Sequence, residues 1–119
     1  MRVLYVDDEP LLLRAFARLL RSHGVAVDLA DSAEAALDYF NPLKATKRPD
    51  ALVTDLEMPG AHGDALISYL RLKTSWCGPM VLLSAAPDVH ERGAIAGATA
   101  TLEKPATAEQ ILKAIGWTT

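Results

Sequence analysis

The sequence lacks several features that whole classes of protein depend on. Cys77 is the only cysteine among 119 residues, so no disulfide can form within the chain, and a reducing cytoplasm is the expected location. No apolar run approaches the ~20 residues of a membrane-spanning helix, and the start, MRVLYVDDE, is too short and too acidic for a signal peptide. A net charge of −3 argues against direct nucleic-acid binding, which requires clustered Lys and Arg.

What the sequence does contain is a regular alternation of apolar runs and helical patterns. Five runs predict β-strands: RVLYV (2–6), VAVDLA (25–30), ALVT (51–54), MVLLS (80–84) and ATATLE (98–103). The first, third and fourth are continuously apolar, as in strands covered on both faces. Strict alternation with helices predicts an α/β fold, with a parallel sheet, right-handed crossovers and helices on both faces. At this length we expect one domain, residues 1–119.

Each predicted strand is followed by a helical pattern. Helices are expected within residues 10–24, after Asp31, over 63–73, before Gly97 and after Thr107. The buried face of the first is predicted to consist of Leu12, Phe16, Leu19 and Leu20. Three pairs of residues are predicted to form capping boxes: Asp31 with Glu34, Asp88 with Glu91, and Thr107 with Gln110.

Polar side chains stand where four of the predicted strands end. They are Asp7 and Asp8, Asp55, Ser84 and Lys104. Ligands of open parallel sheets bind beyond the carboxyl ends of the strands, so these side chains are expected to converge. Carboxylates so close together raise one another's pKa unless a cation lies between them. Because the available ligand atoms are oxygens, the sequence predicts a hard ion, Mg²⁺.

The same set of groups suits phosphoryl transfer to an aspartate. The metal and Lys104 would neutralise phosphoryl oxygens, and Ser84 would donate a hydrogen bond. Taken singly, each residue has an ordinary structural explanation, such as a turn or a helix cap. Their shared position at the ends of successive strands has none, since an unneutralised acidic cluster costs stability.

The motifs VLYVDDEP, LVTDLEMPG, VLLSA and GATATLEKP resemble, in combination, the receiver domain of bacterial two-component response regulators. The resemblance covers the whole chain. It implies a flavodoxin-like (βα)5 fold with a five-stranded parallel sheet of order 2-1-3-4-5. It also implies a role in phosphorelay signalling, in which the chain is a phosphoprotein and not a turnover enzyme, although it catalyses its own phosphorylation and dephosphorylation.

The resemblance assigns a role to each residue at the strand ends. Asp55 is the expected phosphoacceptor, taking its phosphoryl group from a phosphohistidine of a sensor histidine kinase or a phosphotransfer protein. Asp8, Asp55 and the backbone carbonyl of Glu57 are expected to bind Mg²⁺, with Asp7 acting through metal-bound water. The residues expected to contact phosphoryl oxygens are Ser84 and Lys104.

The resemblance further implies that phosphorylation changes protein contacts on the face made by the fourth helix, the fifth strand and the fifth helix. The expected partner there is a downstream effector protein or an output domain outside this sequence, and homodimerisation stays open. The sequence departs from the family pattern on this face: Thr101 stands where Tyr or Phe is usual, and Ala106 where an aromatic residue is usual.

Three alternatives compete with this interpretation. A receiver that is no longer phosphorylated would act only as a docking module, but the five site residues are retained. An aspartyl-phosphate phosphatase of the haloacid dehalogenase type would require a second Asp two positions after Asp55, where this chain has Glu57. A flavodoxin-like redox protein would require a Ser/Thr/Gly-rich phosphate loop after the first strand, where this chain is acidic.

Overall fold

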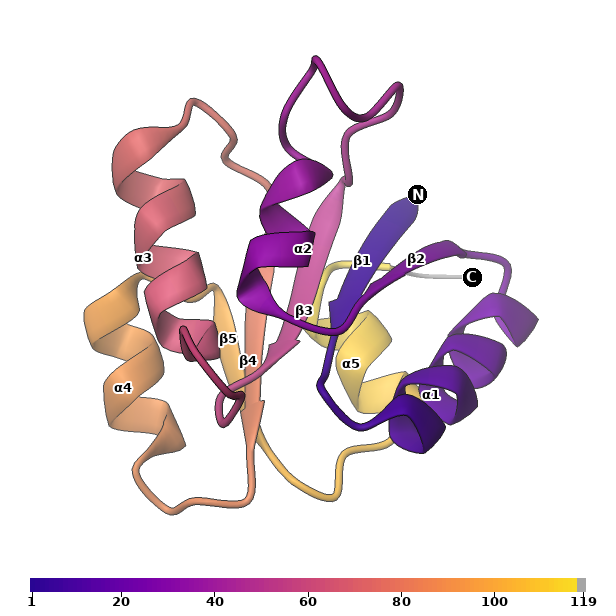
Figure 1. The fold of residues 1–119 in the computed structure, drawn as a ribbon. Coiled ribbons are helices and arrows are strands. Elements are labelled where there is room, and N and C mark those ends of the chain that lie inside the picture. The colour runs from indigo at the N-terminus through magenta and orange to yellow at the C-terminus, as the bar shows by residue number, and fades with distance from the viewer. Residues whose placement is uncertain (118–119) are drawn as a thin grey trace.

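The computed structural model describes residues 1–117, which form alternating strands and helices (Figure 1). Their bounds are β1 Arg2–Val6, α1 Pro10–Ser22, β2 Ala26–Ala30, α2 Ala33–Asp38, β3 Ala51–Asp55, α3 Gly63–Lys73, β4 Met80–Ser84, α4 Val89–Ala96, β5 Ala100–Glu103 and α5 Ala108–Ala114. The strands pair in parallel in the order β2-β1-β3-β4-β5. This confirms the predicted fold class and strand order. The last two residues of the predicted domain, 118–119, lie outside the described residues.

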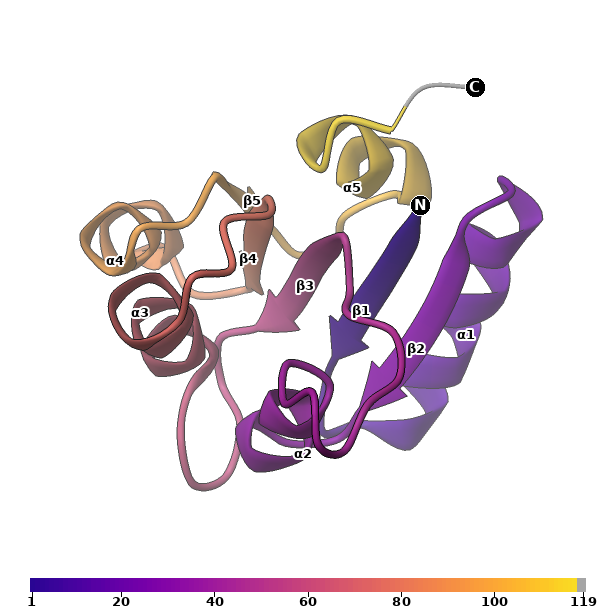
Figure 2. The same cartoon turned by 90° about the horizontal axis from the view of Figure 1, so that it is seen from above.

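The sheet is covered on both faces, so the fold has three layers. Figure 2 shows α1 and α5 on one face and α2, α3 and α4 on the other. The central strands β3 and β4 are buried along their whole length, as their continuously apolar sequences predict. The edge strand β5 is partly exposed and starts two residues later than predicted, at Ala100. Among residues 1–117, no helix is both long enough and apolar enough to cross a membrane.

The buried face of α1 differs from the predicted one. Its buried residues are Leu13, Ala17 and Leu20, whereas Leu12 is 37% and Leu19 49% exposed. Leu20 is buried as predicted, and Phe16 is partly buried and packs against the core. Leu13 and Ala17 lie one position after Leu12 and Phe16, which is a turn of about 100° around the helix.

Only one of the three predicted capping boxes forms. Thr107 and Gln110 bond reciprocally at the start of α5, as predicted. At α2 the cap is Ser32, whose hydroxyl accepts a hydrogen bond from the Ala35 N–H, so the prediction for Asp31 is wrong by one residue. Asp88 precedes α4 without a side-chain capping bond, so that predicted box is also wrong.

Candidate functional site

Parallel pairing brings the ends of four strands to one edge of the sheet. The arrowheads of β3 and β4 point to this edge in Figure 1. Backbone hydrogen bonds continue just beyond the strands: the Asp7 N–H donates to Ala30 O at 3.2 Å, and the Lys104 N–H donates to Ser84 O at 2.9 Å. Asp7, Asp55 and Ser84 are 1%, 5% and 0% exposed. The fold therefore places these polar groups at the sheet edge with little access to water.

Lys104 pairs with two of the carboxylates, and its pair with Asp7 spans 97 residues of sequence. Its Nζ lies 2.9 Å from Asp55 Oδ1 and 3.4 Å from Asp7 Oδ2, and its side chain is 25% exposed. A single ammonium thus faces two buried carboxylates. These three residues converge, as predicted from their positions at the strand ends.

The carboxylates leave room for a second cation. Asp7, Asp8 and Asp55 each offer an oxygen, and these oxygens lie within 4.8 Å of one another. Asp55 Oδ1 is buried and, although Lys104 Nζ is close enough for an ion pair, no donor among residues 1–117 is aligned to give it a hydrogen bond. A buried acceptor without a donor is costly, and Mg²⁺ prefers carboxylate oxygens. These residues therefore fit a magnesium ion.

The pKa values of the paired groups follow from burial and charge. Burial is the main cause that raises the pKa of Asp55; Lys104 opposes the shift, and the neighbouring charges of Asp7 and Glu57 add to it. For Lys104, burial alone would lower the pKa, but the close carboxylates of Asp55 and Asp7 outweigh it and raise the pKa. Lys104 therefore stays an ammonium at neutral pH, while Asp55 lacks full compensation for its negative charge.

Among residues 1–117, no hydrogen bond joins Ser84 to Asp55. Its hydroxyl donates to Glu57 Oε1 at 2.6 Å and accepts from the Ala86 N–H at 2.9 Å. Sequence reasoning missed this pair, because only the position of Glu57, two residues after Asp55, marked it as a neighbour of the site. The predicted metal-binding role of the Glu57 carbonyl stays a prediction.

Gly63 is a second residue that sequence reasoning missed. It begins α3, and a Cβ at this position would lie 2.0 Å from the backbone oxygen of Asp55. The signal for it was a glycine at the start of a helical pattern, which is an unusual first helical residue. Only glycine therefore lets α3 start directly against the peptide of the candidate phosphoacceptor.

Thr101, at the position where the family usually has an aromatic residue, packs against α4. Its hydroxyl is hydrogen-bonded to His90 Nδ1, and His90 Nε2 lies 3.2 Å from Glu103 Oε1. A Cβ on Gly93 would lie 2.1 Å from Thr101 Cγ2, so the absence of that side chain allows the close approach. Thr101 is thus packed against α4 at Gly93 and hydrogen-bonded to it at His90.

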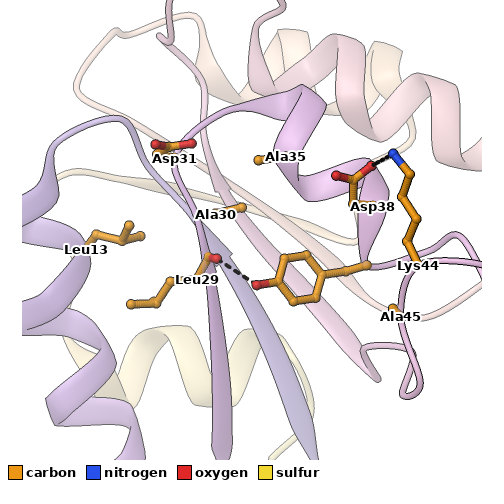
Figure 3. A pocket seen from close by; sticks show the side chains of 9 residues that line it. Leu13, Leu29, Ala30, Asp31, Ala35, Asp38, Lys44 and Ala45 are labelled. Carbon is orange, nitrogen blue, oxygen red and sulfur yellow. Dashed lines mark hydrogen bonds and ion pairs between the residues drawn. The ribbon is translucent and has the colours of Figure 1, made fainter.

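Two of the cavities formed by the described residues bear on where the site lies. One of about 340 Å³ opens beside the site and is lined mainly by apolar groups: Tyr5, Asp7, Leu12, Phe16, Leu83, Ala85, Lys104, Pro105 and Ala106. Another of about 580 Å³ lies against β2 and α2, where Lys44 pairs with Asp38 and the Tyr39 hydroxyl donates to Leu29 O (Figure 3). None of the predicted site residues lines the second cavity.

Magnesium binding at this edge is expected to stabilise the fold. At a Mg²⁺ concentration of 100 times Kd, the free energy of unfolding should rise by about 2.7 kcal/mol. Asp8→Asn should remove most of that increment. Without Mg²⁺ the variant should be at least as stable as the parent, because one of three clustered negative charges is gone. Urea unfolding with and without Mg²⁺ measures both effects.

The matched control is Glu34→Gln, which removes an exposed carboxylate on α2 and should keep the full Mg²⁺ increment. If Asp8→Asn kept the increment as well, the ion would bind elsewhere.

Comparison with known proteins places this geometry in a family. The family model described as "Response regulator receiver domain" matches residues 3–116. Among curated proteins, "Response regulator MprA" of Mycobacterium avium (strain 104) is 39% identical over 114 residues, which cover 94% of this chain and 48% of the relative. The MprA protein of Mycobacterium leprae (strain TN) is 38% identical over 117 residues, covering 97% and 49%. The chain thus spans about half the length of these relatives.

Solved structures agree with the sequence comparison. A response regulator receiver protein from Burkholderia phymatum superposes with a TM-score of 0.80 at 32% identity, covering 99% of this chain and 97% of that one. The chemotaxis response regulator CheY4 of Vibrio cholerae gives a TM-score of 0.79 at 29% identity, covering 94% and 92%. Both coverages are nearly complete, so the likeness includes the strand ends that carry the site.

Proposed function

Because this chain belongs to the response regulator receiver domain family, and so to phosphorelay signalling, we propose that Asp55 accepts a phosphoryl group from a phosphohistidine of a sensor histidine kinase or phosphotransfer protein. The observation that carries this proposal is the state of the Asp55 carboxylate. It is 5% exposed, it lies 2.9 Å from the Lys104 ammonium, and its Oδ1 has no aligned donor among residues 1–117. It is a buried anion paired with one ammonium, beside the oxygens of Asp7 and Asp8 that fit a metal ion.

The transfer forms one bond and breaks one. An Asp55 carboxylate oxygen attacks phosphorus, an O–P bond forms, and the electron pair of the P–N bond returns to the imidazole of the donor. Lys104, the ammonium nearest to Asp55, neutralises charge on the phosphoryl oxygens. Hydrolysis of the acyl phosphate by water reverses the modification, so the domain removes its own phosphoryl group and is not a turnover enzyme.

The groups that fit Mg²⁺ are the clustered oxygens of Asp7, Asp8 and Asp55. In the proposed arrangement Asp8 and Asp55 bind the ion directly with the Glu57 carbonyl, and Asp7 binds through water. When bound, Mg²⁺ neutralises the negative charge that donor and acceptor bring together. The role of the protein in this step is to hold its carboxylates close together in spite of their repulsion. Lys104 contributes by pairing with two of them.

The proposed output is a change in protein contacts on the α4, β5 and α5 face. The downstream partner is an effector protein or an output domain, which accords with a chain that spans about half of its curated relatives. In this chain Thr101 and Gly93 set α4 directly on β5, so a change at the site acts on a helix held by packing and by His90. Residues 1–119 are proposed to be one receiver domain in the cytoplasm.

The proposal is tested by incubating the purified chain with Mg²⁺ and acetyl phosphate and then measuring the intact mass. We expect an adduct of one phosphoryl group that disappears when EDTA removes the metal and is absent from Asp55→Asn. Asp55→Asn keeps the shape of the side chain and replaces the charged carboxylate nucleophile with a neutral amide. Asp38→Asn, at an exposed carboxylate on α2, is the matched control and should be phosphorylated normally.

Each alternative has its own outcome. A chain that takes no phosphoryl group at any Mg²⁺ concentration would be a docking module, and the proposal would be wrong. A catalytic release of phosphate from many small phosphomonoesters, with no adduct retained, would favour the phosphatase.

A further inference from the structure

The Ser84 hydroxyl is committed to an acceptor other than the phosphoacceptor. It is fully buried at the end of β4, and its single O–H donor points to Glu57 Oε1 at 2.6 Å. A serine hydroxyl can donate only one hydrogen bond. Its lone pairs already accept the Ala86 N–H at 2.9 Å, which fixes the oxygen in place. For this hydroxyl to donate a hydrogen bond to a phosphoryl oxygen on Asp55, its hydrogen bond to Glu57 must first break.

We propose that the Glu57 side chain is a positioning residue that holds the Ser84 hydroxyl away from Asp55 before phosphorylation and releases it afterwards. This inference rests on the proposed function and deepens it, because it names the group to which Ser84 is hydrogen-bonded before Asp55 is phosphorylated. Glu57 acts on the reaction through Ser84 and does not itself touch the phosphoryl group.

The strength of this hold follows from the exposure of the two partners. The bond is short and charge-assisted, and such bonds are about twice as strong as neutral ones. Glu57 is exposed, however, so after release water replaces the serine as its donor. The free-energy cost of breaking the hydrogen bond is therefore only the difference between the serine and water as donors to Glu57. The expected result is a modest bias toward the unphosphorylated state, on the order of tenfold, and not a block.

The probe for this bias is beryllium fluoride with Mg²⁺, because its tetrahedral adduct on a carboxylate has the shape and charge of an acyl phosphate. Calorimetry measures its affinity without any turnover. Glu57→Met removes the acceptor and keeps the length of the side chain, and it should bind the probe about tenfold more tightly than the parent. Glu57→Gln retains a carbonyl acceptor and should stay within about threefold of the parent.

Two comparisons separate this mechanism from a simple charge effect. If Glu57 acted by repelling the anionic probe, Gln and Met would raise the affinity equally, and the inference would be wrong. If Glu57 acts through the serine, the gain from Glu57→Met should shrink to less than about twofold in a Ser84→Ala background. An undiminished gain there would also overturn it.

A spectroscopic measurement needs neither metal nor probe. The Ala86 amide donates to Ser84 Oγ, so its NMR chemical shift reports on the polarisation of that oxygen. Glu57→Met should move this resonance in the unmodified protein, whereas Glu34→Met, at an exposed carboxylate on α2, should not. An unmoved Ala86 resonance would contradict the hydrogen bond itself.

The inference and the proposed function fail in distinguishable ways. A parent protein that binds no beryllium fluoride in the presence of Mg²⁺ and forms no acetyl phosphate adduct contradicts the function. A parent protein that does both, with an affinity that Glu57→Met leaves unchanged, contradicts only the role of Glu57.

Discussion

Replacing Lys104 by methionine is expected to slow the phosphorylation of Asp55 by about 10²- to 10³-fold, the usual loss when one charged donor is removed from a site where negative charge accumulates. The same substitution should tighten Mg²⁺ binding. Lys104 is the ammonium paired with Asp7 and Asp55, so it competes with a metal for their oxygens. Binding and chemistry therefore respond in opposite directions, which a general loss of folding would not produce.

Two measurements check this prediction. Intact mass against time with acetyl phosphate gives the rate, and the Mg²⁺ dependence of urea unfolding gives the metal affinity. Lys113→Met, at an exposed lysine on α5, is the matched control and should change neither. A Lys104→Met protein that is phosphorylated at the parental rate would remove Lys104 from the mechanism.

The position of the site could be predicted from sequence because it depends on backbone topology. Alternating strands and helices specify a parallel sheet, and a parallel sheet brings the residues after its strands to one edge whatever their side chains. Asp7, Asp55 and Lys104 meet there as predicted. The order of the strands came from the family resemblance, since alternation alone permits other orders.

The contacts of individual side chains could not be predicted in the same way. Whether Ser84 turns toward Asp55 or Glu57 depends on a rotamer that is set by the amide of Ala86 and by the reach of Glu57, both of which are tertiary facts. The helical pattern of α1 left two apolar stripes of equal spacing. The buried stripe includes Ala17, and the pattern of apolar residues alone does not distinguish it from the other stripe.

The glycines show the same division between local and tertiary information. Gly97 ends α4 with a left-handed φ of 93°, a role that sequence predicts for a glycine at a helix terminus. At Gly63 the local signal is a glycine at the first helical position, which does not show why glycine is needed there. Glycine is needed there because the folded β3–α3 connection brings the peptide of Asp55 against Gly63. That contact exists only in the folded chain, so the sequence around Gly63 does not reveal it.

Gly63→Ala is expected to destabilise the domain by at least about 3 kcal/mol, a large fraction of the 5–15 kcal/mol that holds a typical domain together. Alanine is the better helix former, by about 1 kcal/mol, so propensity alone predicts the opposite sign. The steric effect is larger because the new Cβ would lie 2.0 Å from Asp55 O and 3.0 Å from Thr54 Oγ1, and a backbone oxygen cannot move aside without shifting the strand end.

The control for this prediction is Gly60→Ala in the same connection. Gly60 has a φ of 78° and nothing within 4 Å of its added Cβ, so that variant should show only the strain of a left-handed residue, about 1–2 kcal/mol. Urea unfolding at fixed Mg²⁺ measures both losses. Since the strand end that must shift carries Asp55, Gly63→Ala should also weaken Mg²⁺ stabilisation, whereas Gly60→Ala should not. Equal losses in the two variants would mean that α3 does not start against the peptide of Asp55.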